Sequence, residues 1–483
     1  MAVQAFYSCG NTAATGNYPD RRITMAPDSS NTISAVINDA DDPASLLGID
    51  FTIGDDSPPT GDLFVTAASS NTSVVPNANL ILSGSGTTRN LKIKAIAAGY
   101  STITVTVTDG AHRSSYLLNY AASQTTSATG KHWHTGIADA SAAIGIDDEY
   151  MIVANDETNY LYIYNRNHSG LPVKSFDFNQ GNILGLTDSI AGMWRAVDVE
   201  GGVRSTNNPS VIYWIGSMSN NSISDDRPNR NRLFAITVSG KGAAASFTNA
   251  GHYSNLRELL ISWGNVQGYD FASSAVAGKN PKQGDGFNIE GMVFGPDNRT
   301  MYIGFRAPLV PTASRTKAVI APIQNFESWF NNGLPAGNPI IGSPIELDLG
   351  GRGIRDLIRL PNGNYVIIAG NCDHEVRPAV YTWTGYATDA PTKINSFDLT
   401  GLNVEGVLPV YKDGKVLLNK LQVITDNGND IYYSDTIYAK NLSSDNFKKF
   451  SSVITESPQK VVVLSLTFNT LFSKPYSILS VKQ

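Results

Sequence analysis

The stretch Asn288-Ile289-Glu290-Gly291-Met292-Val293-Phe294 decides the fold, together with the residues that follow it. An asparagine and a carboxylate lead into an apolar run, and a turn at Asp297-Asn298-Arg299 separates this run from a second one, Met301-Tyr302-Ile303-Gly304. We interpret the two runs as a β-hairpin. Because the second antiparallel strand returns to where the first began, we expect Glu290 and Arg306 to lie at the same end of the hairpin.

The opening of this stretch recurs elsewhere in the chain. Three further segments show it: Asp198-Val199-Glu200-Gly201, Gly353-Ile354-Arg355-Asp356 and Asn403-Val404-Glu405-Gly406. A fourth begins at Asp139-Ala140-Ser141. Hairpins repeated in this way, with polar residues at one end, predict a β-propeller whose channel mouth collects those side chains. We count five such hairpins after position 132 and expect the segment after Tyr432 to supply a sixth blade.

The chain before these hairpins has a different strand pattern. Ile103, Val105 and Val107 alternate with threonine residues and lead into a turn at Asp109-Gly110. Such alternation is typical of a strand with one buried face. This ladder resembles the last strand of bacterial immunoglobulin- and cadherin-like modules, and the resemblance implies a β-sandwich of about 90 residues.

We therefore predict an all-β protein in which an N-terminal immunoglobulin-like sandwich precedes a β-propeller of six blades. A segment rich in small polar residues, from Ser123 to Gly130, marks the linker between them. The expected parts are a loose lead-in (1–30), the sandwich (31–121), the linker (122–131) and the propeller (132–483). Residues 461–483 match no blade pattern, and two interpretations stay open for them, a closing strand and a non-native tail.

Composition and charge limit the function. Lys and Arg number 36 against 42 Asp and Glu, the net charge is −6, and no basic stripe is present, which argues against nucleic-acid binding. No run is long and apolar enough to span a membrane. The low lysine content and the many Thr, Asn and Ser residues indicate a secreted or periplasmic protein whose signal sequence has been removed from the chain as written. Cys9 and Cys372 are far apart, which disfavours a disulfide and a thiolate metal site.

The carboxylates of the repeated segments are the candidates for a functional site. Innermost propeller strands start near the axis, so we expect Glu200, Glu290, Glu405 and Asp356 to converge there. Several carboxylates in one channel repel each other unless a cation or arginine residues neutralise them. Ca²⁺ takes six to eight oxygen ligands, which carboxylate and amide side chains supply. The expected Ca²⁺ ligands are Asp198, Glu200, Asn288, Glu290, Asn403 and Glu405.

Arginine residues offer a second way to neutralise these carboxylates. Arg306 and Arg355 lie in or next to the repeated segments. In the alternative interpretation, each glutamate only binds backbone N–H groups at a seam between blades and pairs with one of these arginines. His374, between two acidic residues, is a candidate proton carrier. The expected catalytic residues are Glu290, Arg306, Arg355, Asp356 and His374.

Two other groups have metal-ligating side chains. Asp39, Asp41 and Asp42 form an acidic loop of the kind that binds Ca²⁺ in cadherin-like modules, but we favour a solvated acidic loop, because the cluster is short and no partner ligands are in view. His132 and His134 are spaced as two residues of one strand, which also suits a strand edge and makes Zn²⁺ the less favoured metal.

The motifs together resemble a known family. The matching segments are Asp139-Ala-Ser-Ala-Ala, Ala154-Asn-Asp-Glu-Thr-Asn, Asp198-Val-Glu-Gly, Gly216-Ser-Met-Ser, Arg230-Asn-Arg-Leu, Asn288-Ile-Glu-Gly, Gly304-Phe-Arg-Ala-Pro, Leu349-Gly-Gly-Arg-Gly-Ile-Arg-Asp-Leu and Glu405-Gly-Val. Over about 300 residues they resemble a bacterial propeller family of unknown function. They are more distantly similar to esterase-like phytase and gluconolactonase/paraoxonase propellers, a resemblance that implies a Ca²⁺ site in the central channel.

Two functions follow as expectations. The first is a Ca²⁺-dependent hydrolase of small phosphoesters, esters or lactones, similar to phosphotriesterases, lactonases or phytases, in which Glu290 or Asp356 attacks or activates water and Arg306 or Arg355 stabilises negative charge. The second is a non-catalytic cell-surface module that binds a glycan or a protein through one propeller face. Fold alone does not decide between them, because propellers serve both roles.

Overall fold

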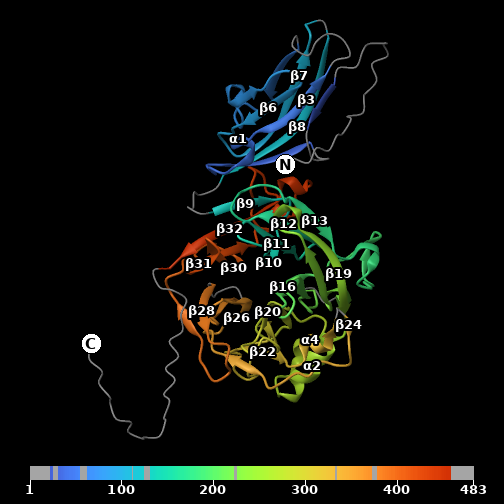
Figure 1. The fold of residues 1–483 in the computed structure, drawn as a ribbon, viewed down its shortest axis with the longest axis vertical. Helices are drawn as coiled ribbons and strands as arrows, with labels where there is room; N and C mark the ends of the chain where they lie inside the picture. Colours follow the sequence, from blue (N-terminus) through green and yellow to red (C-terminus); the bar gives the residue numbers. More distant parts are fainter. Residues whose placement is uncertain are drawn as a thin grey trace, which may run out of the picture.

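A computed structural model describes residues 22–25, 31–54, 63–110, 112–124, 131–221, 226–331, 334–372 and 378–457 of the 483-residue chain. The described residues form an all-β protein with seven four-stranded sheets and two small two-stranded ones (Figure 1). Among these residues, no helix has the length and apolar character required to cross a membrane.

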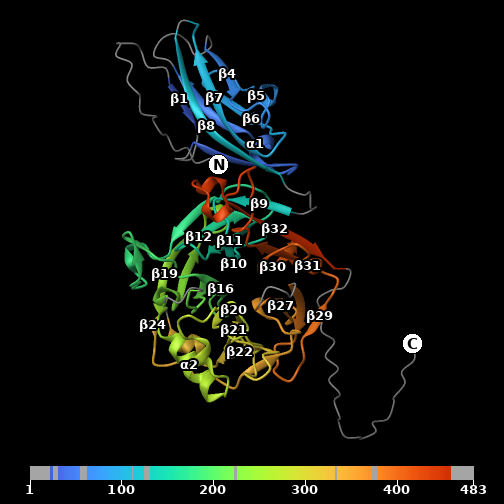
Figure 2. The same ribbon diagram turned by 180° about the vertical axis from the view of Figure 1, so that it is seen from behind.

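Two of the four-stranded sheets come from the N-terminal part and pack face to face (Figure 2). The first contains β1 (Arg22–Met25), β3 (Ile49–Gly54), β6 (Thr88–Ile93) and β5 (Leu80–Ser83), in that order. The second contains β2 (Thr32–Ile37), β8 (Arg113–Gln124), β7 (Gly99–Thr108) and β4 (Phe64–Ser69), with β2 parallel to β8. Phe51 and Leu91 of the first sheet and Ile103 and Val105 of the second belong to one buried cluster. The alternation in β7 that predicted a strand with one buried face is confirmed.

Five four-stranded antiparallel sheets form the rest of the described chain. The first two are β10 (Ala140–Gly145), β11 (Tyr150–Asn155), β12 (Tyr160–Asn165) and β13 (Lys174–Asp177), and β16 (Val199–Arg204), β17 (Val211–Gly216), β18 (Leu233–Ser239) and β19 (Ser246–Tyr253). The next two are β20 (Asn288–Phe294), β21 (Met301–Ala307), β22 (Ala318–Ile323) and β25 (Ile345–Leu347), and β26 (Gly353–Arg359), β27 (Tyr365–Gly370), β28 (Ala379–Trp383) and β29 (Thr392–Ile394). The last is β30 (Val404–Lys412), β31 (Lys415–Thr425), β32 (Lys449–Glu456) and β9 (Lys131–Thr135).

The first strands of these five sheets lie side by side in a closed circle. β10 contacts β16, β16 contacts β20, β20 contacts β26, β26 contacts β30, and β30 returns to β10 (Figure 1). The last sheet takes its outer strand, β9, from the start of this part of the chain, so the sheet joins its two ends. We expected a sixth sheet after Tyr432, and this expectation is wrong for the described residues, because β32 pairs with β31 and completes the fifth sheet.

Each innermost strand carries a β-bulge at the same place. The pairing with the second strand skips one residue in each sheet: Ser141, Glu200, Glu290, Arg355 and Glu405. A bulge leaves its extra residue out of the ladder and redirects the side chain. The repeated sequence motif is therefore the sequence of this bulge. In the fourth sheet the bulged residue is Arg355, so the expected equivalence of Asp356 with the glutamates is wrong by one position.

Glycine follows the bulged glutamate where neighbouring sheets come closest. A Cβ atom on Gly291 would lie 2.3 Å from Cδ2 of Leu357 and 2.9 Å from Cγ2 of Ile354, both in the next sheet of the circle. A Cβ atom on Gly406 would lie 3.4 Å from the backbone nitrogen of Ala143 across the seam between the last sheet and the first. In the Glu-Gly pair, the glutamate is left out of the hydrogen-bond ladder between the strands. The glycine lets its backbone come close to the neighbouring sheet.

The longest helix packs on the outer part of this circle of sheets. α2 (Leu256–Val266) buries Leu256, Leu260 and Trp263 in an apolar cluster that also contains residues of β20, β21 and β22. Nε1 of Trp263 donates a hydrogen bond to the backbone oxygen of Gly342 at 2.9 Å. The helix is thus a packing element whose apolar side faces the sheets.

The acidic loop of the N-terminal part joins the two groups of sheets. Asp41 accepts hydrogen bonds from Nδ1 of His168 at 3.0 Å and from the backbone nitrogen of Ser169 at 2.7 Å. Asp39 accepts one from Oγ of Ser169 at 2.7 Å, and Asp42 caps α1 (Pro43–Leu46). These contacts correct both expectations for the loop, since its carboxylates neither gather into a cation site nor only face solvent.

Candidate functional site

The bulged residues of three neighbouring strands meet in a buried charge network. Nη1 of Arg306 lies 2.8 Å from Oε1 of Glu290, and Nε of Arg355 lies 3.1 Å from Oε2 of the same carboxylate. Arg355 also donates to Oε1 of Glu405. The network therefore connects β20, β21, β26 and β30 across the circle of inner strands. The predicted proximity of Glu290 and Arg306 is confirmed.

The arginines keep Glu290 ionised in spite of its burial. Burial by itself would raise the pKa of the Glu290 carboxyl, but Arg306 and Arg355 outweigh burial and hold this pKa below its ordinary value. Arg306 donates a hydrogen bond to Oε1, whereas Arg355 only forms an ion pair with Oε2, which accepts no hydrogen bond from the described residues. Two guanidinium groups thus lie beside the carboxylate where a metal ion would bind. Glu290 is suited to holding the arginines in place, and its lowered pKa makes it a weak base.

A second group of carboxylates has less compensation, since among its members only Asp198 pairs with an arginine of the described residues, Arg230. Oxygen atoms of Asp156, Asp198 and Glu200 lie within 4.8 Å of one another. Burial raises the pKa of Asp156 well above its ordinary value, and the nearby charge of Asp198 adds to the effect. Burial, Glu290 and Asp198 likewise raise the pKa of Glu200 well above its ordinary value. Like charges brought together in this way favour proton uptake or cation binding.

We call Asp156, Asp198 and Glu200 the acidic cluster. Asn288 adds a neutral oxygen beside it. Its side chain is 3% exposed, and its Nδ2 atom donates to Oε1 of Glu290 at 2.8 Å. No described group donates a hydrogen bond to its Oδ1 atom. Oδ1 of Asp156 also lacks a partner among the described residues. Two buried oxygens without donors are the kind of groups that a bound cation satisfies.

Local backbone structure positions the acidic cluster. Asp198 immediately precedes β16 and has a positive φ of 60°, a conformation that aspartate adopts more readily than most residues. Its carboxylate accepts a hydrogen bond from Oγ of Ser217, and Oδ2 lies 3.2 Å from Nη1 of Arg230. Asp156 comes directly after β11, and Glu200 is the bulged residue of β16.

The acidic cluster and Asn288 line one cavity of about 960 Å³. Basic residues share the lining of this cavity: Arg195, Arg227, Arg230 and Lys282. Tyr160 and Trp194 also line it and are 40% and 41% exposed. The cavity thus combines a carboxylate pole, cationic groups and exposed aromatic surface.

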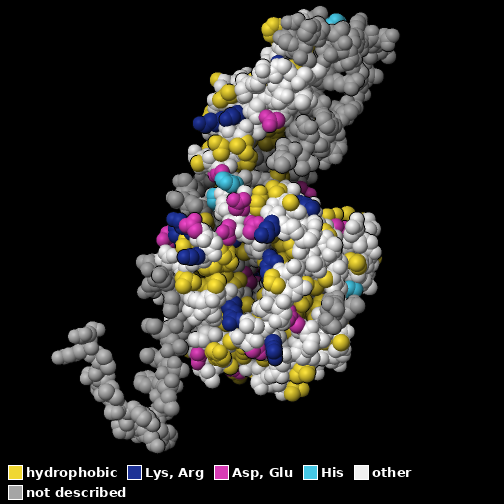
Figure 3. All heavy atoms as spheres, viewed as in Figure 1, with side chains coloured by type: hydrophobic (Ala, Val, Ile, Leu, Met, Phe, Trp, Pro, Cys, Tyr) yellow, Lys and Arg dark blue, Asp and Glu magenta, His cyan; other side chains and the backbone are white. Residues whose placement is uncertain are grey.

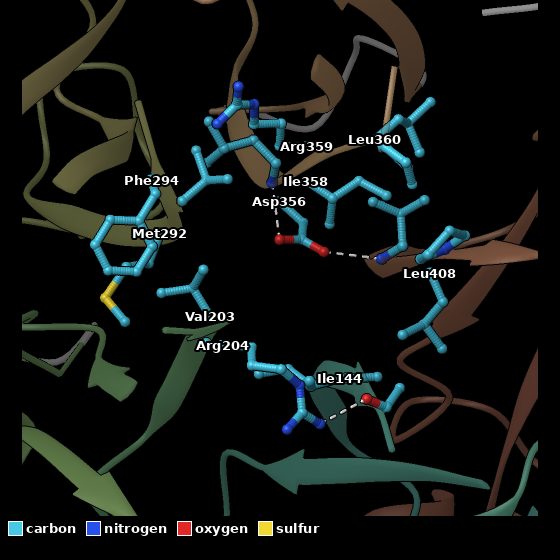
Figure 4. Close-up of a pocket in the computed structure, with 18 of the residues that line it drawn as sticks. Ile144, Val203, Arg204, Met292, Phe294, Asp356, Ile358, Arg359, Leu360 and Leu408 are labelled. Carbon is cyan, nitrogen blue, oxygen red and sulfur yellow. Dashed lines mark hydrogen bonds between the residues drawn. The ribbon is translucent and has the colours of Figure 1, made fainter. Parts of the chain in front are cut away.

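Asp356 does not belong to this cavity. Its two carboxylate oxygens accept hydrogen bonds from the backbone nitrogens of Leu357 and Val407, both at 2.8 Å (Figure 4). Burial raises its pKa to about 7. It lines a second cavity, which lies at the C-terminal ends of the inner strands. Its expected convergence with the glutamates is therefore wrong.

The remaining predicted residues lie apart from the acidic cluster. Asn403 is exposed and donates to Oδ2 of Asp426 at 3.0 Å, so it does not join Asn288 in one site. His374 lies outside the described residues. His134 is buried with Nε2 2.9 Å from Oγ of Ser452, whereas Nδ1 of His132 lies 3.4 Å from Asp41, so the two histidines have separate partners. Cys372 is buried and free, and Cys9 lies outside the described residues.

The sequence interpretation missed Asp156 and Arg230. Asp156 follows the second strand of its sheet, whereas the Ca²⁺ ligands predicted from the repeated motif all lie at the starts of first strands. The signal was present in Asn155-Asp156-Glu157, which ends the first hairpin with acidic residues. Arg230 lies within a loop between strands, where no periodic pattern marks it.

The charges on one face of the molecule are mixed in sign. On the face shown in Figure 3, Lys and Arg side chains are interspersed with Asp and Glu side chains, and no continuous basic patch covers the five-sheet part. This surface fits the low charge content of the chain, which is 16%.

The fold and the site define an all-β protein with a ring of sheets around an acidic cluster. Residues 236–416 match the family described as a protein of unknown function, DUF3616. This part of the chain thus corresponds to a family without an assigned activity. No curated protein matches the chain. The kinship with phytase and gluconolactonase propellers stays a prediction.

Solved structures share only a weak overall likeness with the chain. A DUF4623 family protein from Bacteroides eggerthii is 10% identical, with 91% of this chain and 95% of that chain covered and a TM-score of 0.30. A putative phosphatase from Bacteroides thetaiotaomicron is 8% identical, with 90% and 98% covered and a TM-score of 0.28. A quinonprotein alcohol dehydrogenase-like protein from the same species is 10% identical, with 91% and 99% covered and a TM-score of 0.26. TM-scores of this size support no inference about activity.

Proposed function

We propose that the ring of five sheets is a five-bladed β-propeller behind an immunoglobulin-like sandwich, and that it is a secreted or periplasmic Ca²⁺-dependent hydrolase of small phosphoesters. The observation that carries the proposal is the acidic cluster with its two donor-free buried oxygens, Oδ1 of Asp156 and Oδ1 of Asn288. Ca²⁺ prefers carboxylate and amide oxygens, and a bound ion would compensate the repulsion that raises the pKa values of Asp156 and Glu200.

The ligand set of this proposal differs from the one expected from sequence. Asp198, Glu200 and Asn288 are retained, and Asp156 is added. Glu290 and Glu405 are left out because arginines pair with them. Their role is to hold Arg355 and Arg306 beside the site.

A divalent cation at the acidic cluster would polarise a phosphoryl or carbonyl oxygen of the substrate. Lys282 lines the same cavity and brings positive charge to an anionic substrate, and Arg195 also lines this cavity but forms an ion pair with Asp188 at 3.1 Å. Asp156 would hold the cation through Oδ1, which takes no hydrogen bond from the described residues. The basic lining favours phosphoesters over neutral lactones.

A second candidate is a non-catalytic module that binds a glycan. Trp194 and Tyr160 are large aromatic side chains, 41% and 40% exposed, on the wall of the cavity. Exposed aromatic surface at a concave site is typical of ligand recognition. Under this alternative the cation, if bound, orders the site and performs no chemistry.

The test uses chromogenic phosphotriester, phosphodiester, carboxylester and lactone substrates, with and without a chelator. We expect phosphoester turnover that the chelator abolishes and Ca²⁺ restores. Asp156→Asn and Glu200→Gln should each lower turnover at least about a hundredfold and weaken Ca²⁺ binding measured by calorimetry. Glu149→Gln, at an exposed turn, is the matched control. Glycan binding without turnover of any substrate would support the second candidate instead.

A further inference from the structure

The ring of inner strands has a second cavity at the ends of the strands away from the acidic cluster. Its volume is about 690 Å³, within the range of small-molecule sites. Along β20, Asn288 lines the cavity of the acidic cluster and Met292 lines the second cavity, with Glu290 between them. We call this second cavity the distal cavity.

The wall of the distal cavity is mostly apolar. All five inner strands or the residues that follow them contribute to it (Figure 4). Its apolar lining includes Ile144, Val203, Phe294, Ile358, Leu360 and Leu408. Such a wall favours the apolar body of a ligand, because burying that body removes it from water.

Two arginines lie at the edge of this apolar wall without a carboxylate partner. Arg204 donates to the backbone oxygens of Pro209 and Gly145. Arg359 donates to Oδ1 of Asn298 and to a backbone oxygen. Neither guanidinium forms an ion pair with a described residue, and in each, two of the five N–H donors are used by the hydrogen bonds named. Figure 4 shows the two side chains on opposite sides of the cavity.

A third guanidinium lies behind the wall. Arg166 is 2% exposed, and its Nη2 atom donates to the backbone oxygen of Pro409, which lines the distal cavity. Its Nη1 atom has no partner among the described residues. Its charge is not balanced by an ion pair in the described chain, so it adds to the positive potential at this end of the ring.

Three carboxylates also border the distal cavity, and two of them are committed to backbone groups. Asp356 accepts from two backbone nitrogens, and Asp147 accepts from the backbone nitrogens of Glu149, Tyr150 and Gly242. Asp148 is exposed at the rim. The groups left to meet a ligand in the cavity are therefore the apolar wall, the two arginines and, at the rim, the exposed carboxylate of Asp148.

We propose that the distal cavity is a second binding site, separate from the acidic cluster, for a small amphipathic carboxylate. The aromatic or aliphatic body of the ligand occupies the apolar wall, and its carboxylate lies at the rim against Arg204 or Arg359. A neutral apolar molecule would leave the guanidinium groups without a negatively charged partner, and a small hydrophilic anion would leave the apolar wall uncovered.

The test measures binding of 2-naphthoate and of 2-naphthol, which share one aromatic body and differ in charge, by calorimetry on the full chain. We expect naphthoate to bind at least about tenfold more tightly, the size of one charge-assisted hydrogen bond. Arg204→Gln or Arg359→Gln should remove that difference and leave naphthol affinity within about twofold. Arg113→Gln, on an exposed strand of the N-terminal part, is the matched control and should change neither affinity.

A variant at an exposed position tests the proposal without disturbing the buried core. Tyr411 lines the distal cavity and is 36% exposed, so Tyr411→Glu is compatible with folding and should weaken naphthoate binding while naphthol binding persists. The proposal is overturned by equal affinities for the two ligands, by no binding of either, or by naphthoate binding that Lys282→Gln weakens while neither Arg204→Gln nor Arg359→Gln does. The last result would assign the ligand to the cavity of the acidic cluster.

Discussion

Glu290, near the start of β20, and Arg306, near the end of β21, lie 16 positions apart in sequence, and Nη1 of Arg306 donates a hydrogen bond to Oε1 of Glu290 at 2.8 Å. The carboxylate side chain is 2% exposed and the guanidinium side chain is 12% exposed. Because Arg355 contacts the other oxygen of the same carboxylate, one buried glutamate balances two arginines. Removing Glu290 would take a negatively charged partner from both buried arginines. Arg355 would still pair with Glu405.

We therefore predict that Glu290→Ala lowers the free energy of unfolding by about 3–5 kcal/mol, the cost of leaving a buried charge without its partner. Urea denaturation followed by tryptophan fluorescence measures the change. Glu456→Ala is the control, because Glu456 pairs with Lys420 at 2.9 Å while its side chain is 56% exposed. That substitution should cost less than about 1 kcal/mol. Equal losses for both variants would contradict a structural role for the buried network.

The meeting of Glu290 with Arg306 was predictable, because hairpin geometry fixes which residues share one end. The common position of Glu200, Glu290 and Glu405 was also predictable from their motif. The assignment of Asp356 to the same group failed, because sequence alone did not show which residue of the Arg355-Asp356 pair is the bulged one. A shift of one residue moves a side chain to the other face of a strand.

The acidic cluster was only partly predictable. Asp198 and Glu200 belong to the repeated motif, and Asn288 begins its third copy. Asp156 reaches the same place from the end of a second strand, and its contribution depends on how two sheets pack side by side. The predicted number of sheets was wrong for a similar reason. β32 and β9 lie far apart in sequence and pair only in the folded chain.

The close approach of inner strands leads to a second prediction. Gly291→Ala would place a Cβ atom 2.3 Å from Cδ2 of Leu357, a side chain that is 1% exposed. The leucine must move within a filled core, so we expect a loss of about 1–3 kcal/mol in the free energy of unfolding. Gly401→Ala tests the same substitution where no atom lies within 4 Å of the added carbon but φ is +75°. A thermal or urea denaturation series in which Gly291→Ala is as stable as the parent would contradict the close packing.

A third prediction concerns pH and Ca²⁺. Burial raises the pKa of Asp139 to about 7, and it raises the pKa values of Asp156 and Glu200 well above their ordinary values. A carboxyl group with a raised folded-state pKa stabilises the fold below its unfolded pKa of about 4, and this contribution is lost as the pH rises through the folded pKa. In chelator, these three groups should therefore favour the fold less at pH 8 than at pH 5.

Protons compete with Ca²⁺ for the same oxygens, so the increase in melting temperature caused by Ca²⁺ should grow from pH 5 to pH 8. Differential scanning calorimetry with chelator and with Ca²⁺ at each pH measures this increase. Asp156→Asn should reduce it at every pH, and Glu149→Gln should leave it unchanged. An increase that is the same from pH 5 to pH 8 would show that Ca²⁺ does not bind at the acidic cluster.

The last prediction concerns Lys449, where the N-terminal sheets meet the ring. Its Nζ atom donates to Oγ of Ser123 at 2.9 Å and to the backbone oxygen of Ala35 at 3.3 Å, and the side chain is 0% exposed. Burial lowers its pKa to about 7, although Asp42 and Asp39 oppose the effect.

The unfolded chain keeps this lysine protonated up to a pH of about 10. Between pH 7 and that value the unfolded state binds more protons than the folded state, so stability should rise with pH, by at most about 1.4 kcal/mol per pH unit. Lys449→Met should make the free energy of unfolding less dependent on pH between 7 and 9, measured by urea denaturation. Lys448→Met, at the neighbouring position where the lysine pairs with Asp445 at 2.9 Å, should keep the dependence of the parent. If Lys449→Met and the parent show the same slope, the lysine is charged in the fold and its two hydrogen bonds outweigh its burial.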